Sequence, residues 1–237
     1  MKLSVILLNT MANPSGHRPA PLFIDTDAID GQLPPELRTS IRPDAFDTAE
    51  EDKITAIAGH FEAIMQELGL DLADDSLAGT PRRVAKMYVQ EWFAGLNPAA
   101  RPDVKLFDNR YGYHEMLVER DITVFSCCEH HFVPIMGKAH VAYLPGNQVV
   151  GLSKLNRVVQ YYARRPQVQE RLTRQIGHEL QQSLGTPDVA VLIEADHLCV
   201  MSRGVNDTHS STITADYGGR FASDETLRRE FMRQIGK

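Results

Sequence analysis

Residues 116–132 read MLVERDITVFSCCEHHF, and residues 137–145 read GKAHVAYLP. Both stretches are rich in β-branched and aromatic residues, which favour extended strands. The sequence PGN at 145–147 is typical of a turn. We therefore predict a strand-forming region between about residues 113 and 150. The first of these strands leads into two cysteines, a glutamate and two histidines, all of which can bind a metal or move a proton.

Helical periodicity precedes this region. Apolar residues recur at helical spacing between residues 49 and 69. The sequence GTPRRVAKMYVQEWFAGL at 79–96 predicts a second helix, with Thr80 as its N-cap and Pro81 at the first helical position.

Further helices and strands are predicted after the strand-forming region at 113–150. Ser153 can cap a helix through 154–165, and a longer helix follows the interruption at Pro166. The remaining predicted elements are a strand at 188–202, a short strand at 211–219 and a helix at 224–235. These elements predict an α+β fold, in which an antiparallel sheet carries helices on one side and a helical part precedes it.

The chain divides into three parts on this basis. Residues 1–48 carry many Pro, Asp and Gly residues without sustained periodicity, which predicts a flexible N-terminal arm. Residues 49–112 form the predicted helical region, and residues 113–237 form the sheet-bearing domain.

Composition excludes several classes of protein. A formal net charge of −6 argues against general nucleic-acid binding. The sequence contains no run of about 18 apolar residues, so we predict no membrane-spanning helix. The opening MKLSVILLNTM is similar to a signal peptide, but no small-residue cleavage site follows closely, so we expect a cytoplasmic protein. Three cysteines cannot form a disulfide framework, so reduced thiols or a metal site are expected.

The cysteines and histidines have the spacing of metal ligands. Cys128 and His131 are separated by two residues, and Cys199 is the remaining distant cysteine. We interpret Cys199 as lying on a strand, with His197 on the same face two residues before it. Two thiolates and one imidazole leave a fourth position for water, as in catalytic zinc sites. A cysteine on a strand is more often a core residue, and we assign that role to Cys127.

Two imidazoles remain beside this predicted metal site. His130 and His197 have an ordinary pKa near neutrality, which suits general acid–base catalysis. Glu129 has two interpretations of equal weight, a carboxylate that orients a histidine or a solvated strand residue.

A group of cations suggests an anionic ligand. Ser153, Lys154 and Arg157 lie at the start of a predicted helix, where backbone N–H groups favour anions. Further arginines are Arg203, which follows the strand at 188–202, and Arg82 and Arg83 in the first turn of the second helix. Each alone is more often a surface charge, but together they indicate a phosphorylated substrate. Gln169 and Glu170 begin the next helix, where Glu170 alone would be an ordinary first-turn acid.

Four motifs together resemble the GTP cyclohydrolase I family. They are CEHHFVP, GKAHVAYLPGNQVVGLSKLNR, RRPQVQERLT and DHLCVMSRGV, and the resemblance extends over about residues 50–237. It implies that residues 113–237 are a catalytic tunnelling-fold domain. It also implies an assembly of two stacked pentamers into a homodecamer with active sites at subunit interfaces. The implied reaction converts GTP and water to formate and 7,8-dihydroneopterin triphosphate, a first step of tetrahydrofolate and pterin synthesis.

The resemblance also implies roles for individual residues. Zn²⁺ would be held by Cys128, His131 and Cys199, and water activated by zinc would attack C8 of the purine. His130 or His197 would protonate the ring nitrogen, and His197 with Ser153 would serve the later ribose steps.

The substrate contacts follow from the same motifs. Glu170, with Gln169 beside it, would hold the guanine edge. The triphosphate would be bound by Lys154, Arg157, Arg203 and, from a neighbouring subunit, Arg83. Asn206 stands where some relatives carry a basic residue, so we expect a less charged phosphate side here.

Three other functions compete with this one. A zinc nucleobase deaminase would need a C-x-x-C segment, which the chain lacks. A nitrile reductase on the same fold would use a nucleophilic cysteine and a nicotinamide cofactor, without the Cys₂His arrangement. A structural zinc module would need a fourth protein ligand, for which Cys127 and His130 are the candidates.

Overall fold

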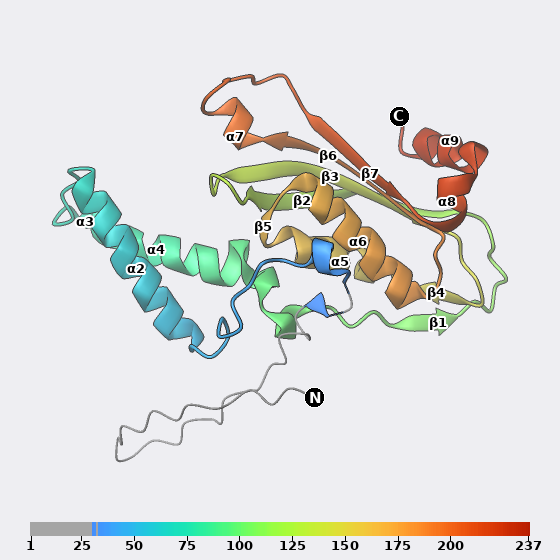
Figure 1. Cartoon of the computed structure of the whole chain (residues 1–237), viewed down its shortest axis with the longest axis horizontal. Helices are drawn as coiled ribbons and strands as arrows, with labels where there is room; N and C mark the ends of the chain where they lie inside the picture. The colour runs from blue at the N-terminus through green and yellow to red at the C-terminus, as the bar shows by residue number, and fades with distance from the viewer. Residues whose placement is uncertain (1–29, 32) are drawn as a thin grey trace, which may run out of the picture.

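The computed structural model describes residues 30, 31 and 33–237 and has a five-stranded sheet at its centre (Figure 1). The strand order is β5-β2-β3-β6-β7, and every pairing is antiparallel except that of β5 with β2. The strands are β2 (Leu117–Cys128), β3 (Pro134–Tyr143), β5 (Pro166–Gln167), β6 (Val189–His197) and β7 (Thr212–Tyr217). A separate two-stranded sheet pairs β1 (Leu106–Asp108) with β4 (Gln148–Val150).

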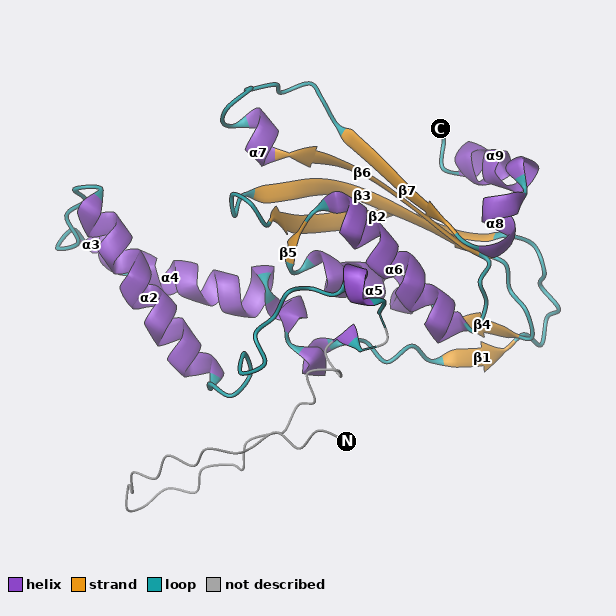
Figure 2. Cartoon of the chain, in the orientation of Figure 1, coloured by secondary structure: helices purple, strands orange, loops and turns teal. Residues whose placement is uncertain are grey.

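Helices lie around this sheet and in an N-terminal hairpin that extends away from it (Figure 2). The α-helices are α2 (Glu50–Glu67), α3 (Asp75–Ala78), α4 (Thr80–Lys86), α5 (Leu152–Ala163), α6 (Gln169–Leu184), α7 (Leu198–Met201), α8 (Gly219–Ser223) and α9 (Glu225–Gln234). The shorter turns are 3₁₀ segments η1 (Pro35–Leu37), η3 (Ala94–Leu96) and η4 (Pro98–Ala100), and a π-helical segment η2 (Met87–Trp92). The α+β architecture predicted from the sequence is confirmed.

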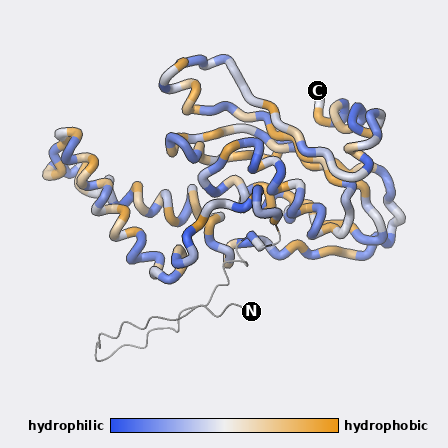
Figure 3. The backbone as a smooth tube through the Cα atoms, viewed as in Figure 1, coloured by the Kyte–Doolittle hydropathy of each residue, from blue (hydrophilic) through white to orange (hydrophobic). Residues whose placement is uncertain are grey.

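The core forms between the sheet and the two amphipathic helices α5 and α6. Val158 and Val159 of α5 and Ile176 of α6 are fully buried there. The strands contribute alternate residues, because successive side chains of a strand point to opposite faces. In β6, Val191 and Ile193 belong to this core, whereas Leu192 packs in a smaller cluster with Phe221 and Phe231 of α8 and α9. Figure 3 shows the same concentration of apolar residues where the helices meet the sheet.

Two predicted helix caps differ in the structure. Gly79 rather than Thr80 is the N-cap of α4, and Gly151 rather than Ser153 is the N-cap of α5. Thr80 instead accepts a hydrogen bond from Arg83 at 3.0 Å. Glycine caps a helix nearly as well as threonine because it adopts the required backbone without a side-chain bond. No helix within residues 30, 31 and 33–237 is long and apolar enough to cross a membrane.

The end of the predicted N-terminal arm is packed against the protein. Leu33 and Leu37 are buried in the core, and Gln175 of α6 donates a 2.6 Å hydrogen bond to the Leu37 carbonyl. Within the predicted arm, Leu33 and Leu37 therefore bury apolar surface against the core, whereas residues 38–48 are exposed or partly exposed. The rest of that prediction falls on residues 1–29 and 32, outside the described residues.

A buried ion pair fixes this segment. Arg165 Nη1 donates to both carboxylate oxygens of Asp30, at 2.8 and 2.9 Å. Neither side chain is more than 4% exposed. The Arg165 guanidinium also lies over the rings of Tyr161 and Tyr162, 4.5 and 4.6 Å from their centroids. A buried cation needs such partners, because it has lost its hydration.

Replacing Asp30 with alanine is expected to lower the free energy of unfolding by about 3–5 kcal/mol, because Arg165 would stay buried without its carboxylate. Urea denaturation followed by the fluorescence of Trp92 measures it. The matched control is Asp44→Ala, which removes an exposed pair with Arg42 and is expected to change stability by less than about 1 kcal/mol. Equal effects of the two variants would contradict the structural role of the buried pair.

Candidate functional site

The loop between β2 and β3 is short and strongly bonded. Cys127 pairs with Pro134 at the end of the ladder, Cys128 N donates to the Val133 carbonyl at 2.9 Å, and Phe132 N donates to the Cys128 carbonyl at 2.8 Å. Phe132 has φ of 53°, a left-handed conformation that is unusual for a bulky residue. Its ring packs on those of Tyr88 and Phe93, which stabilises the turn. The turn brings His131 back beside Cys128.

Cys199 reaches the same place from another element. His197 ends β6 opposite Ile135 of β3, and Cys199 follows in the single-turn helix α7. The prediction that Cys199 lies on a strand was wrong, because the strand ends at His197 and the backbone turns into a helix. Even so, the turn of helix brings the thiol to the β2 loop. The ligand atoms of Cys128, His131 and Cys199 all lie within 4.8 Å of one another.

This group can hold a metal ion. Cys128 Sγ is 3.9 Å from His131 Nδ1. Typical zinc bonds of about 2.3 Å to sulfur and about 2.0 Å to nitrogen place tetrahedral ligands roughly 3.6 Å apart. The atoms of Cys128 and His131 are therefore within a few tenths of an ångström of a binding arrangement. Among the described residues the group comprises three side chains, and His130 does not belong to it although its Nδ1 is 3.9 Å from Cys128 Sγ.

The three thiols have different surroundings. Cys127 is 1% exposed, and burial raises its pKa to about 12, with a smaller contribution from Cys128. Burial also raises the pKa of Cys199, and the hydrogen bond and charge of Cys128 add to that effect. Cys127 packs in the interior, as the sequence predicted. The other two thiols face each other, so that two thiolates there require a cation between them.

The histidines outside the group have their own partners. His197 Nε2 lies 2.7 Å from Gln169 Oε1. Burial lowers the pKa of His197, and the charges of Glu170 and Asp196 oppose that shift. His130 Nε2 is 4.0 Å from Glu129 Oε1. Each imidazole therefore has a polar group on one side, and His130 also lies beside Cys128 of the candidate metal group.

Glu129 is held by a residue that the sequence analysis did not identify. Arg171 of α6 pairs with the Glu129 carboxylate and also donates to the Gln167 side chain at 3.0 Å and the Pro166 carbonyl at 2.8 Å. Glu129 thus bridges Arg171 and His130, which favours the orienting interpretation of this residue over the solvated one. An arginine in the first turn of a helix gives no sequence signal for such a role.

One predicted anion-binding residue lies beside the metal group. Arg203 Nη1 is 2.6 Å from His131 Nε2. Glu170 is exposed in the first turn of α6, close enough to His197 for its charge to act on that imidazole. Asn206 has φ of 54°, which asparagine adopts more readily than most residues. This backbone conformation gives a structural reason for asparagine at that position.

The other predicted anion-binding residues lie elsewhere in the chain. Ser153 and Lys154 are in the first turn of α5, and the far end of α5 leads to β5 beside Cys127. Ten residues of helix separate Ser153 from that end, which is about 15 Å along the axis. Within one chain, the structure therefore does not bring Ser153 to His197.

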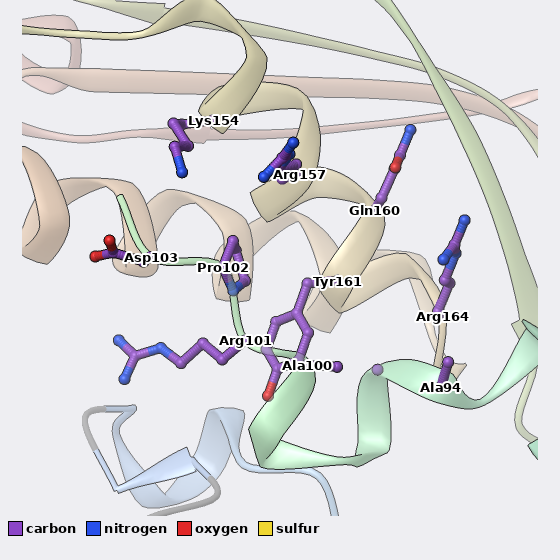
Figure 4. Close-up of a pocket in the computed structure, with 11 residues that line it drawn as sticks. Ala94, Ala100, Arg101, Pro102, Asp103, Lys154, Arg157, Gln160, Tyr161 and Arg164 are labelled. Atoms are coloured by element: carbon purple, nitrogen blue, oxygen red, sulfur yellow. The ribbon is translucent and has the colours of Figure 1, made fainter. Parts of the chain in front are cut away.

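A basic pocket lies along α5. Its volume is about 380 Å³, and Figure 4 shows Lys154, Arg157 and Arg164 along one side with Arg101 across from them. None of the candidate metal ligands lines it. Arg83 is further away in α4, where it donates to the Ser76 carbonyl and to Thr80, each at 3.0 Å. The predicted phosphate ligands thus occupy three separate places in the chain.

Comparison with known proteins identifies the family. A family profile described as GTP cyclohydrolase I matches residues 57–236. The chain belongs to the GTP cyclohydrolase I family. It is 56% identical to GTP cyclohydrolase 1 of Flavobacterium johnsoniae over 213 aligned residues, and this alignment covers 90% of this chain and 95% of that protein. It is 53% identical over 199 residues to GTP cyclohydrolase 1 of Escherichia coli O1:K1 / APEC, covering 84% and 90%. Every candidate site residue lies within the range that matches the GTP cyclohydrolase I profile.

Substitutions of the adjacent Cys127 and Cys128 test which of the two binds zinc. Cys128→Ala is expected to lose most bound zinc, because it removes one of three ligands, whereas Cys127→Ala is expected to keep about one zinc per chain. Elemental analysis of protein purified with zinc, after gel filtration, measures the difference. Loss of zinc in Cys127→Ala, or its retention in Cys128→Ala, would contradict this assignment.

Proposed function

We propose that this protein is a zinc-dependent GTP cyclohydrolase I, which converts GTP and water to formate and 7,8-dihydroneopterin triphosphate. The observation that carries the proposal is the three-residue group of Cys128, His131 and Cys199, with His130 beside it and His197 two residues before Cys199. Three protein ligands with accessory imidazoles are typical of catalytic rather than structural zinc sites. The family membership of the chain supports the same reaction.

The donor set supports zinc as the metal. Two cysteines and one histidine are soft and borderline ligands that suit Zn²⁺ better than Mg²⁺ or Ca²⁺. When bound, zinc supplies Lewis-acid activation of water for attack on the purine. We also propose a cytoplasmic location, which the free thiols of all three cysteines support.

The acid–base steps fall to the two imidazoles. In sequence, His130 lies between Cys128 and His131, and His197 lies two residues before Cys199; His130 is also 3.9 Å from Cys128 Sγ. A neutral imidazole can accept a proton and return it later in the reaction. The lowered pKa of His197 favours the neutral form, which suits a group that first accepts a proton. Glu129, paired with Arg171, would hold the His130 ring in place.

Glu170 would recognise the guanine edge. Its carboxylate is exposed in the first turn of α6, next to His197, and a carboxylate can accept two parallel hydrogen bonds from guanine N1–H and the exocyclic amine. The phosphate side would use Arg203 of the same chain, with Lys154, Arg157 and Arg83 as further ligands. Asn206 would leave this side less charged than in relatives with a basic residue there.

The separation of these residues supports a site shared between subunits. Lys154, Arg157 and Ser153 lie at the start of α5, and Arg83 lies in the N-terminal hairpin. The sheet also has exposed apolar residues on one face, including Phe125, Met136 and Ile213. We propose a homodecamer of two stacked pentamers, in which neighbouring chains supply the missing cations and extend the sheet from its edge strands.

The reaction itself is tested with purified, zinc-loaded protein and GTP. We expect release of formate together with the fluorescence of an oxidised pterin product. His197→Ala is the matched variant, because it is expected to keep zinc and lose turnover. Zinc-loaded protein that consumes no GTP would contradict the proposed function.

Mixing two inactive variants tests the shared site. Cys128→Ala removes a metal ligand and Arg157→Ala removes a phosphate ligand, and each homo-oligomer is expected to be inactive or nearly so. Equal amounts of the two variants, unfolded and reassembled together, should recover about a quarter of the wild-type activity. In that fraction of sites, one chain supplies an intact metal group and its neighbour supplies an intact Arg157. If both residues served one site within one chain, no activity would return.

A further inference from the structure

Gln169 is more deeply buried than its expected role in substrate binding requires. It is the first residue of α6, and it is 2% exposed. Its neighbour Glu170 is exposed. The side chain of Gln169 is directed into the protein, where its hydrogen bonds are with β6, β7 and His197 at the end of β6. From the sequence, Gln169 was expected beside Glu170 at the guanine edge, and these hydrogen bonds give it a different position.

The orientation of the Gln169 amide is fixed by its surroundings. Nε2 lies 3.1 Å from the Ile193 carbonyl, 2.9 Å from the Thr212 carbonyl and 3.1 Å from Thr214 Oγ1, so its two N–H groups are shared among three acceptors. Carbonyl oxygens only accept hydrogen bonds, so the nitrogen of the amide must face them. A flipped amide would place Oε1 against two carbonyl oxygens.

Two threonines determine which groups donate and which accept around the Gln169 amide. Thr173 Oγ1 donates to the Gln169 carbonyl at 2.8 Å, so its single proton is used. The contact of 2.6 Å between Thr173 and Thr214 is then donated by Thr214. The remaining lone pair of Thr214 is available for the amide of Gln169. The donor and acceptor roles of Gln169, Thr173 and Thr214 agree with one another, which favours a rigid network.

The tautomer of His197 follows from the amide. Gln169 Oε1 can only accept, and it lies 2.7 Å from His197 Nε2, so that nitrogen must carry a proton. A neutral imidazole has one N–H, which leaves the lone pair of His197 on Nδ1. Nδ1 is then the nitrogen that accepts a proton.

We propose that Gln169 is a positioning residue that holds His197 in the Nε2–H tautomer and thereby makes Nδ1 its proton-accepting atom. This inference deepens the proposed function and rests on it, since His197 is the acid–base group of that reaction. Gln169 acts through His197 and does not touch the substrate. The backbone carbonyls of the sheet thus determine which nitrogen of the imidazole takes part in the chemistry.

The tautomer is measured directly on the wild-type protein. Solid-state ¹⁵N NMR of the zinc-loaded, histidine-labelled protein distinguishes a protonated ring nitrogen from one with a lone pair, and the His197 signals are assigned by their loss in His197→Asn. We expect neutral His197 with the proton on Nε2. A proton on Nδ1 would overturn the proposal, whether or not the protein converts GTP. Failure of the GTP assay with the expected tautomer would instead count against the proposed function.

Kinetics of a variant test the consequence. Gln169→Met keeps the length of the side chain and removes the acceptor, so kcat is expected to fall about 100-fold or more, while KM for GTP changes less than about threefold. Zinc content should stay at the wild-type level. Gln182→Met, the same substitution at an exposed position of α6, is the control and should leave both constants unchanged.

Two kinetic results would overturn the positioning role. One is a large rise in KM with kcat retained in Gln169→Met, which would mean that Gln169 contacts the substrate. The other is unchanged kinetics. If Gln169→Met does not fold, the tautomer of His197 measured on the wild-type protein decides the proposal by itself.

Discussion

The pairing of Cys127 with two strands at once is the constraint on which the candidate site depends. Cys127 lies opposite Pro134 in the antiparallel ladder of β2 and β3, and it also lies opposite Pro166 in the parallel pairing with β5. The first pairing closes the loop that carries Cys128, His130 and His131. The second places the start of α6 beside that loop, because only one residue separates β5 from α6. A slip of this register by one residue would reverse which of the two cysteines faces the metal group.

Buried hydrogen bonds connect this loop to the N-terminal segment. Gln175 donates to the Leu37 carbonyl and accepts from Gln167 at 2.7 Å, and Gln167 accepts in turn from Arg171, which pairs with Glu129. Each of these side chains is buried or partly buried, so removal of one leaves its neighbour without a partner in a poorly solvated place. The loop is therefore held from behind by groups that are far from it in sequence. Together with the Arg165–Asp30 pair, this network makes Asp30 and Leu37 part of the support of the loop.

The sequence predicted the local parts of this arrangement well. The spacing of Cys128 and His131 belongs to one short loop, and Cys199 was the remaining distant cysteine, so the ligand group needed little tertiary information. The residues that sequence reasoning placed incorrectly depend on long-range packing. Cys199 lies in a helix because β6 ends at His197, and the amide of Gln169 turns inward because β6 and β7 each offer a carbonyl acceptor there. Neither fact is visible from periodicity within the segment itself.

The remaining differences have a similar cause. Leu33 and Leu37 are two apolar residues in a polar segment, too few to give a periodic signal, yet both are buried against the core. Arg171 was not identified because its partner Glu129 is 42 residues away. Lys154 and Arg157 lie in the motif that follows the one with Cys128 and His131, but the length of α5 carries them to another part of the chain. Neighbouring motifs in a sequence need not meet within a single folded subunit.

The coordination of zinc is the most direct test of the division of roles among these residues. X-ray absorption at the zinc edge of the loaded protein counts sulfur and nitrogen ligands independently of any assay of turnover. Our account predicts two sulfur ligands at about 2.3 Å and one histidine nitrogen at about 2.0 Å, with one further light atom. A third sulfur would bring Cys127 into the site, and a second histidine would bring in His130 or His197. Either result would contradict the assignment of Cys128, His131 and Cys199 as the ligands and of the two remaining imidazoles as the proton carriers.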